Sequence, residues 1–318
     1  MVRRDARLSL EDRPEPTRRS GQVLLETSAA LVGTSADGMV VGGMAIGLIR
    51  EGAGSLVPGL RAFVHPTTPC RKCHACRGGA EGLCDKAKVR GVDLDGTAST
   101  VLVAGRQDVV IVPEGVGDAA ALSAAAFHAL PIAVFGGMAV PRSPIALVTD
   151  IDHDLGLASA HVLAALGWQV IVVGAEPGRR AAAGAAGAAV AVDRSTFPAF
   201  SDAVLDVSEG AGAQLLVDTT GVDGVVDEAL RGRAARTRLV LLGPGGDPEA
   251  GPGVTVERPV PAGATDRAGA IRFVSERGLP DVLVRPEVPV AALDGGSVDD
   301  AVDRVVSFGP GEGSPAET

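Results

Sequence analysis

The sequence contains no tyrosine, a single tryptophan and only seven phenylalanines in 318 residues. The absence of tyrosine excludes any mechanism in which a tyrosine hydroxyl transfers a proton. The formal net charge of −10 argues against nucleic acid or an anionic membrane as a partner. The amino-terminal stretch lacks the apolar segment of a signal peptide, and no uninterrupted apolar run reaches membrane-spanning length. We therefore expect a cytoplasmic protein.

Cysteine is also absent from the chain outside one short Gly/Pro-rich segment. Cys70, Cys73, Cys76 and Cys84 follow the spacing C-x2-C-x2-C-x7-C. Four thiolates in one loop fit a tetrahedral zinc ion, and a site with all four positions filled by protein is structural. An iron–sulfur cluster is the competing interpretation of the same thiolates. Either site suits a reducing compartment better than a disulfide framework does.

The stretch Ile145–Glu176 has the pattern around which the rest of the chain is organised. Two apolar runs of strand length, Ala146–Thr149 and Gln169–Val173, flank a segment whose apolar residues recur at helical spacing. Gly167 stands where the carboxyl end of that helix needs a residue with positive φ. Strand, turn, helix and parallel strand in this order predict the first unit of a dinucleotide-binding fold.

The regions on either side of this unit differ in their predicted secondary structure. Residues from Ala6 to about Ala126 read as short strands separated by Gly, Pro and Asp, and end in an alanine-rich helical segment. Strands and helices alternate after the central unit, which predicts a doubly wound parallel sheet and an α/β fold. The tail from about Gly263 is expected to contain a strand at Val282–Arg285, a helix at Asp299–Val306 and a disordered end at Gly309–Thr318.

The turn between the first strand and helix of the central unit does not suit a dinucleotide. A diphosphate loop needs glycines so that backbone N–H groups can approach the phosphates, and only Gly156 remains of that pattern. Three carboxylates occupy the approach instead. A carboxylate about 5 Å from a phosphate charge costs on the order of 3 kcal/mol at an effective dielectric near 20. We therefore expect ordinary NAD(P) binding to be impaired.

The acidic turn has two interpretations that the sequence leaves open. Asp150, Asp152 and Asp154 can end the strand and cap the helix. Alternatively, they form a functional acidic cluster with His153 as its proton-transfer member.

Several segments together carry a family resemblance. These are the cysteine motif with the preceding FVHP, the segment DGTASTVLVAGRQDVVIVPEGV, the central unit, LLVDTTG and VLLGPGG. They resemble zinc-containing alcohol dehydrogenases of the medium-chain dehydrogenase/reductase superfamily over nearly the whole chain. The resemblance implies a GroES-like domain with the structural zinc over residues 1–130 and a Rossmann domain over residues 131–262. Residues 263–318 would then return to the first domain and end in the tail.

The same resemblance implies a small-molecule ligand in a cleft between the domains, and a homodimer or homotetramer. It also shows where the catalytic zinc of the family is missing. The three ligand positions fall on Val32, on Gly43, which Met44 follows, and on the segment Ala121–Ala126, and none of them carries a zinc donor. We expect no catalytic zinc.

Some members of the family reduce enones or quinones with a nicotinamide cofactor and no zinc. If this chain does so, Gly156, Arg179, Arg180 and Gly243 are the candidate cofactor-binding residues. Thr34 matches the proton-relay hydroxyl of the family, and His65 and His128 are further histidines whose chemistry could serve a ligand site.

Three functional hypotheses follow. The leading one is an alcohol-dehydrogenase-like scaffold that keeps its structural zinc and acts on a small molecule, in specialised metabolism, by non-redox acid/base chemistry. Its candidate groups are His153, Asp150, Asp152 and Asp154, with Thr34 as a further candidate. The second is an NAD(P)H-dependent oxidoreductase without catalytic zinc, and the third is a non-catalytic binding or scaffold protein.

Overall fold

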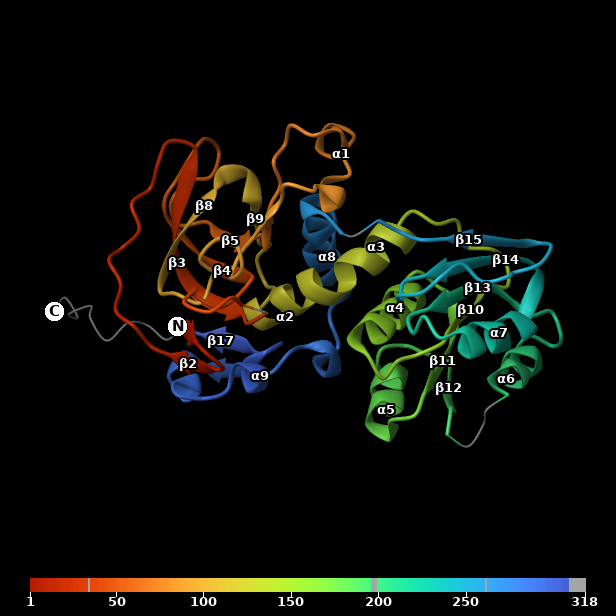
Figure 1. Ribbon diagram of the computed structural model, residues 1–318. Coiled ribbons are helices and arrows are strands. Elements are labelled where there is room, and N and C mark those ends of the chain that lie inside the picture. Colours follow the sequence, from red (N-terminus) through yellow and green to blue (C-terminus); the bar gives the residue numbers. More distant parts are fainter. Residues whose placement is uncertain (34, 196–198, 261, 309–318) are drawn as a thin grey trace. The chain divides into compact units, whose positions relative to one another are not determined.

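The computed structural model describes the whole chain except residue 34, residues 196–198, residue 261 and residues 309–318. The chain divides into two compact units (Figure 1). Unit 1 comprises Met1–Ala125, Gly263–Glu276 and Val284–Thr318, and unit 2 comprises Ala126–Ala262 and Arg277–Leu283. The sequence therefore leaves unit 1, forms unit 2 and returns.

Unit 1 is built on a mixed sheet with the strand order β16-β17-β3-β4-β5-β9, in which β8 also pairs with β3. The long strand β3 pairs antiparallel with β4, β8 and β17 and holds the sheet together. The strands of unit 1 are β1 (Val2–Arg4), β2 (Arg7–Ser9), β3 (Gln22–Leu31), β4 (Met44–Glu51), β5 (Arg61–Val64), β6 (Thr67–Thr68), β7 (Lys88–Val89), β8 (Val101–Gly105), β9 (Val109–Ile111), β16 (Glu287–Pro289) and β17 (Val305–Ser307). Its helices are α1 (His74–Arg77), η1 (Glu81–Leu83), η2 (Arg106–Asp108), α2 (Asp118–Ser123), α8 (Ala264–Arg277, whose last residue belongs to unit 2), η5 (Val290–Leu293) and α9 (Val298–Ala301).

Unit 2 is a parallel sheet with the strand order β12-β11-β10-β13-β14-β15. Helices α4 and α5 lie on one side of this sheet and α6 and α7 on the other (Figure 1). The strands are β10 (Ile145–Val148), β11 (Gln169–Gly174), β12 (Val190–Asp193), β13 (Ala213–Asp218), β14 (Arg233–Leu241) and β15 (Val254–Glu257). The helices are α3 (Ala129–Phe135), α4 (Asp154–Ala165), α5 (Pro177–Ala185), α6 (Phe200–Val207), α7 (Asp223–Arg231) and η4 (Asp281–Leu283), and the π-helix η3 (Ala124–His128) joins α2 to α3.

Unit 2 confirms the predicted doubly wound α/β fold. Every residue of β10 is buried, as expected for a parallel strand that helices cover on both faces. Gly167 ends the first crossover with φ of 96°, which is the left-handed conformation that its position predicted.

The sequence-based assignment of the tail was wrong in three places. Val282–Arg285 is not a strand, because η4 covers its beginning and the strand β16 starts only at Glu287. The helix expected at Asp299–Val306 ends at Ala301, and Val305–Ser307 instead pairs with β3. Helix α8 was missed because few of its residues are buried and apolar, so its apolar periodicity is weak. The predicted disorder of residues 309–318 lies outside the described residues.

The helical stretch Asp118–Phe135 is long and apolar enough to cross a membrane by those two criteria alone. Half of the stretch is buried inside the protein, and buried core helices meet the same criteria. Its apolar composition is thus accounted for by packing.

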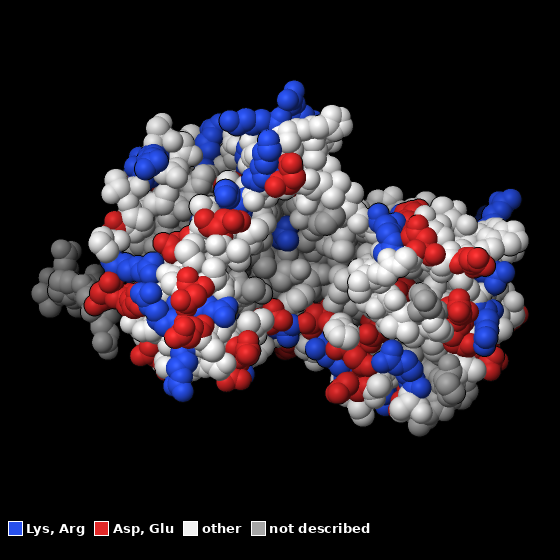
Figure 2. Space-filling model, viewed as in Figure 1, with Lys and Arg blue, Asp and Glu red and all other residues white. Residues whose placement is uncertain are grey.

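Acidic and basic side chains are interspersed over the face of the molecule shown in Figure 2. Charges of opposite sign within a Debye length of about 8 Å offset one another. The face shown therefore presents no extended surface of one sign.

Gly156 brings α4 against the end of β10. A Cβ atom at this position would lie 1.7 Å from the carbonyl oxygen of Asp150. Helix α5 offers a matched control, because a Cβ at Gly184 would meet nothing within 4 Å. We expect Gly156→Ala to lower the free energy of unfolding by about 3 kcal/mol or more, and Gly184→Ala to raise it by about 0.5–1 kcal/mol. Denaturant titration measures both, and equal effects would contradict this account of the turn.

Candidate functional site

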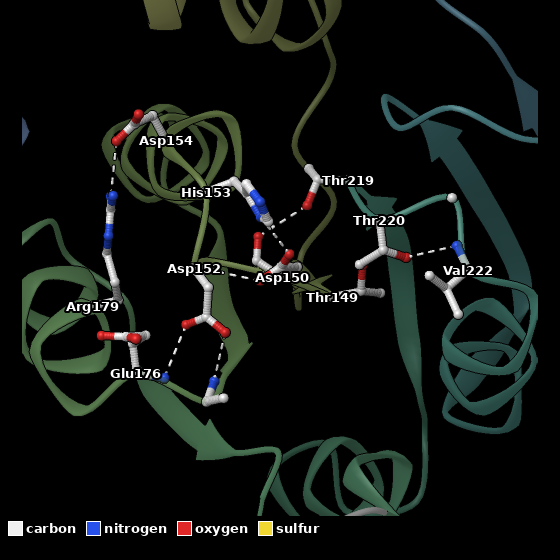
Figure 3. A network of polar contacts seen from close by, with 12 residues as sticks. Thr149, Asp150, Asp152, His153, Asp154, Glu176, Arg179, Thr219, Thr220 and Val222 are labelled. Atoms are coloured by element: carbon white, nitrogen blue, oxygen red, sulfur yellow. Dashed lines mark hydrogen bonds and ion pairs between the residues drawn. The ribbon is translucent and has the colours of Figure 1, made fainter. Parts of the chain in front are cut away.

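The turn from β10 to α4 lies at the carboxyl end of the sheet, between β10 and β13, where the chain direction of the crossovers reverses. In open α/β sheets, ligands bind at this switch point. Thr149 and Asp150 continue β10 into the turn and are buried. Figure 3 shows the polar contacts that surround them.

Side chains fill the turn where a dinucleotide fold has glycines. Ile151 is fully buried. A Cβ atom on Gly174, at the end of β11, would lie 2.7 Å from Cγ1 of Ile151 and 2.9 Å from Oδ1 of Asp152. The two side chains therefore occupy the space between this turn and the end of β11.

The carboxylate of Asp152 links the turn after β10 to the loop after β11. It accepts hydrogen bonds from the backbone N–H groups of Ala175 at 2.8 Å and Glu176 at 3.0 Å (Figure 3). The guanidinium of Arg194 lies 3.5 Å away. The helix-capping interpretation was wrong, because His153 is the N-cap of α4 and its side chain makes no capping hydrogen bond.

His153 and Asp150 form a pair. Nδ1 of His153 lies 2.9 Å from Oδ2 of Asp150, whose other oxygen accepts the backbone N–H of Asp152 at 2.8 Å. The side chain of His153 is 77% exposed, whereas that of Asp150 is 5% exposed. The carboxylate holds the proton on Nδ1 and leaves Nε2 as the ring nitrogen that can accept a proton from a ligand.

A buried carboxylate fixes the neighbouring strand end. Asp218, which is fully buried at the end of β13, accepts hydrogen bonds from the hydroxyls of Thr149 at 2.8 Å and Thr220 at 2.7 Å. The hydroxyl of Thr219 donates to the backbone oxygen of Asp150 at 3.0 Å. These bonds hold the ends of β10 and β13 in register beside His153, and Figure 3 shows the one from Thr219 to Asp150.

The candidate cofactor residues have other partners within unit 2. Arg179 lies 2.8 Å from Asp154, and Arg180 lies 2.7 Å from Asp193. Arg180 also donates to the backbone oxygens of Gly174 and Ala175. Both guanidinium groups are therefore engaged by the protein itself.

Gly156 and Gly243 serve close backbone packing. The contact of Gly156 with Asp150 is described above, and a Cβ on Gly243 would lie 2.6 Å from the backbone nitrogen of Gly221. Glycine at both positions is thus explained without a nucleotide.

Sequence reasoning missed Glu176. An acidic residue about 20 positions after the glycine-rich turn binds the ribose hydroxyls in many dinucleotide folds, and Glu176 lies at that distance from Gly156. The spacing could have identified it. In this structure its backbone N–H is bound to Asp152.

The other candidate histidines are buried. His65 receives a hydrogen bond from Arg267 at Nε2 over 3.1 Å, and burial together with that cation lowers its pKa to about 4. Nε2 of His128 lies 3.1 Å from Nδ1 of His161, and burial, with a smaller contribution from His161, lowers its pKa to about 3. Both side chains stay neutral at neutral pH. Thr34 lies outside the described residues.

The three positions at which the resemblance places catalytic zinc ligands can be described in the structure. Val32 is fully buried in the core of unit 1. A Cβ on Gly43 would contact Pro66 at 3.4 Å, and within the segment Ala121–Ala126 the Ser123 hydroxyl donates to the backbone of Ala119. Among the residues that the structure describes, the four cysteines are the only cluster suited to a metal ion.

The four cysteine sulfurs lie within 4.8 Å of one another. Cys73 caps α1 and Cys84 follows η1, so two short helices position the lobe. Hydrogen bonds from backbone N–H groups lower the pKa of the Cys70 thiol to about 6. Four convergent thiol groups fit tetrahedral zinc, which the loop would bind as four thiolates.

Comparisons with known proteins agree with this architecture. Residues 155–264 match the family described as zinc-binding dehydrogenase. The L-threonine 3-dehydrogenase of Pyrococcus abyssi is 27% identical over 177 residues, which are 55% of this chain and 49% of that protein. The aligned part of the chain thus spans about half the length of this relative.

Two solved structures share the fold over almost the whole chain. Alcohol dehydrogenase TADH from Thermus sp. ATN1 matches with a TM-score of 0.76 at 16% identity. The match covers 96% of this chain and 99% of that protein. The apo form of zinc-dependent alcohol dehydrogenase 2 from Streptococcus pneumonia matches with a TM-score of 0.75 at 16% identity. The match covers 98% of this chain and 99% of that protein. The fold is that of alcohol dehydrogenases with GroES-like and Rossmann domains. The chain thus shares the fold of alcohol dehydrogenases over almost its whole length, and residues 155–264 match the zinc-binding dehydrogenase family.

The cysteine lobe generates a prediction about metal content. We expect one zinc ion per chain by elemental analysis, and at least about tenfold less in Cys84→Ser, because structural zinc needs all four thiolates and supplies local folding energy. The matched control is His74→Gln, which changes an exposed residue of the same lobe and should keep the metal. Two zinc ions per chain, or iron in place of zinc, would contradict the assignment.

Proposed function

We propose that this protein keeps the alcohol dehydrogenase scaffold and a structural zinc but does not carry out zinc-dependent hydride transfer. It acts instead on a small molecule by acid/base chemistry, with His153 as the proton-transfer group. The observation that carries the proposal is the turn in which Ile151 and His153, with Asp152 between them, stand where a dinucleotide fold has its first two glycines.

The steric argument against a dinucleotide is stronger than the electrostatic one. Asp154 is paired with Arg179, and Arg194 lies near Asp152, so their charges are partly offset. The side chains of Ile151 and Asp152 nevertheless fill the gap up to Gly174. Backbone N–H groups of the loop after β11 are already bound to Asp152. A nicotinamide nucleotide therefore does not fit these residues, and the proposed proton transfer does not need one.

The loss of catalytic zinc is supported by the residues in its place. Zinc catalysis needs three protein donors and an open position. Val32 and Gly43 offer none, and the buried Ser123 hydroxyl is engaged with the backbone.

The remaining chemistry belongs to the pair of His153 and Asp150. A histidine held in one tautomer by a buried carboxylate is suited to accept a proton at Nε2 and return it. The exposure of His153 and its place at the switch point make this nitrogen accessible to a ligand at the carboxyl edge of the sheet. The substrate class is a small molecule with an acidic C–H or O–H group, whose proton His153 removes while Asp150 stabilises the imidazolium.

The superfamily resemblance further supports a homodimer or homotetramer in the cytoplasm. The net charge of −10 supports the absence of nucleic acid and membrane partners.

Nucleotide binding tests the first half of the proposal. We expect calorimetric titration with NADH or NADPH to show no binding at millimolar concentration. A variant with Ile151→Gly, Asp152→Ala and His153→Gly opens the turn and should bind NADH at least about tenfold more tightly than the native chain does. Arg272→Gln, on the exposed face of α8, is the control. Micromolar affinity of the native chain for either nucleotide would favour the zinc-independent oxidoreductase instead.

Proton exchange tests the second half. A panel of small ketones and enones incubated in D₂O without nicotinamide should show protein-dependent deuterium incorporation by mass spectrometry. We expect a loss of about 10²-fold in His153→Gln and a smaller loss in Asp150→Asn, because the first removes the base and the second only its orientation. His74→Gln should match the native chain. Exchange that survives His153→Gln, or that requires added NADH, would refute the assignment.

A further inference from the structure

Unit 1 contains a buried arginine that the proposed function does not use. Arg90 follows β7 and is only 7% exposed. Its backbone N–H donates to Pro66, but no described residue accepts a hydrogen bond from its guanidinium or lies within ion-pair distance of it. Buried charged groups are nearly always paired or hydrogen-bonded.

A buried acidic group that lines the same cavity, Asp108, is engaged by other residues. Asp108, which is 4% exposed, lies 2.5 Å from Arg71 and accepts a hydrogen bond from Thr68 at 3.0 Å. It therefore compensates the charge of Arg90 only at longer range. A cation in this setting suits an anionic partner, which the described part of the chain does not supply at ion-pair distance.

Arg90 lines a cavity of about 980 Å³ within unit 1. One wall is the outward face of β8, where Val101 and Val103 are half-buried while Leu102 and Ala104 point into the core. Val40, Leu94 and Phe308 extend the apolar lining. The volume is at the upper end of the range for small-molecule sites, which are typically apolar with a few polar groups that fix orientation.

The charges around the cavity favour a monoanion. Two other cations line it: Arg13 is near Asp95 at 3.4 Å and near Glu11 at 3.6 Å, and the amino-terminal ammonium of Met1 donates to the backbone oxygen of Ala98 at 2.7 Å. Five carboxylates also line the cavity, so its charge apart from Arg90 is acidic: Glu11, Asp12, Glu15, Asp95 and Asp108. A doubly charged phosphate would be repelled more strongly than a carboxylate, whereas a planar guanidinium binds a carboxylate through two parallel hydrogen bonds.

We propose that this cavity is a binding site for a small carboxylate with a hydrocarbon body. The carboxylate is bound by the guanidinium of Arg90, and the hydrocarbon lies along Val101 and Val103 of β8. The site is independent of the pair formed by His153 and Asp150, and it holds whether or not that pair is catalytic.

The test is calorimetric titration of the full zinc-loaded chain with octanoate, 1-octanol and inorganic phosphate. We expect octanoate to bind at least about tenfold more tightly than either of the other probes, because only octanoate satisfies both Arg90 and the apolar wall. Arg90→Gln should weaken octanoate binding at least about tenfold and leave the affinity for octanol unchanged. Arg272→Gln, an exposed arginine of unit 1, should bind octanoate as the native chain does.

A second variant covers the case in which Arg90→Gln does not fold. Val103→Trp keeps the arginine and fills the apolar wall, so it should abolish octanoate binding while circular dichroism shows a folded chain. Failure of the native chain to bind octanoate, equal affinity for octanol, or undiminished binding in Val103→Trp would each overturn the proposal. Phosphate binding as tight as that of octanoate would also overturn it.

Discussion

The packing of Ile151 and Asp152 against the end of β11 is the constraint on which the candidate site depends. Asp152 binds two backbone N–H groups of the loop after β11, and Ile151 is fully buried beside it. Both contacts require that Gly174 has no side chain. The turn is thereby closed by side chains in place of a ligand, and it presents His153 with Asp150 behind it. The size of these two side chains thus determines both the space at the turn and the position of His153 beside Asp150.

The fold was predictable where the chain's own periodicity determines its elements. The buried run of β10 and the helical spacing of α4 identified the first crossover. The tail was not predictable in this way. Val305–Ser307 is a strand because it pairs with β3, more than 270 positions earlier in the chain, and local propensity does not encode that partner.

The site was predictable in composition and not in its contacts. His153 and Asp150 are three positions apart, so their pairing is a local property of the turn. The partners of Asp152 and Asp154 lie in the next crossover, at Glu176 and Arg179, and only the parallel pairing of β10 with β11 brings them together. Arg90 is one of many arginines in the sequence. Residue type alone predicts that an arginine is exposed, whereas Arg90 is buried, and its significance arises from that burial.

Val32 and Ile151 share a physical property, because both are fully buried apolar side chains. A glycine loop that cradles phosphate and an open zinc site both leave polar groups unsatisfied until a ligand binds, and such sites lower stability in return for function. Here Val32 and Ile151 are buried apolar side chains in those positions, and a non-glycine residue also restricts the unfolded chain. The cysteine lobe is different, because a closed zinc site contributes folding energy whether or not the protein is a catalyst. Four thiols in one lobe, with buried apolar side chains at Val32 and Ile151, are therefore the pattern that the proposed function requires.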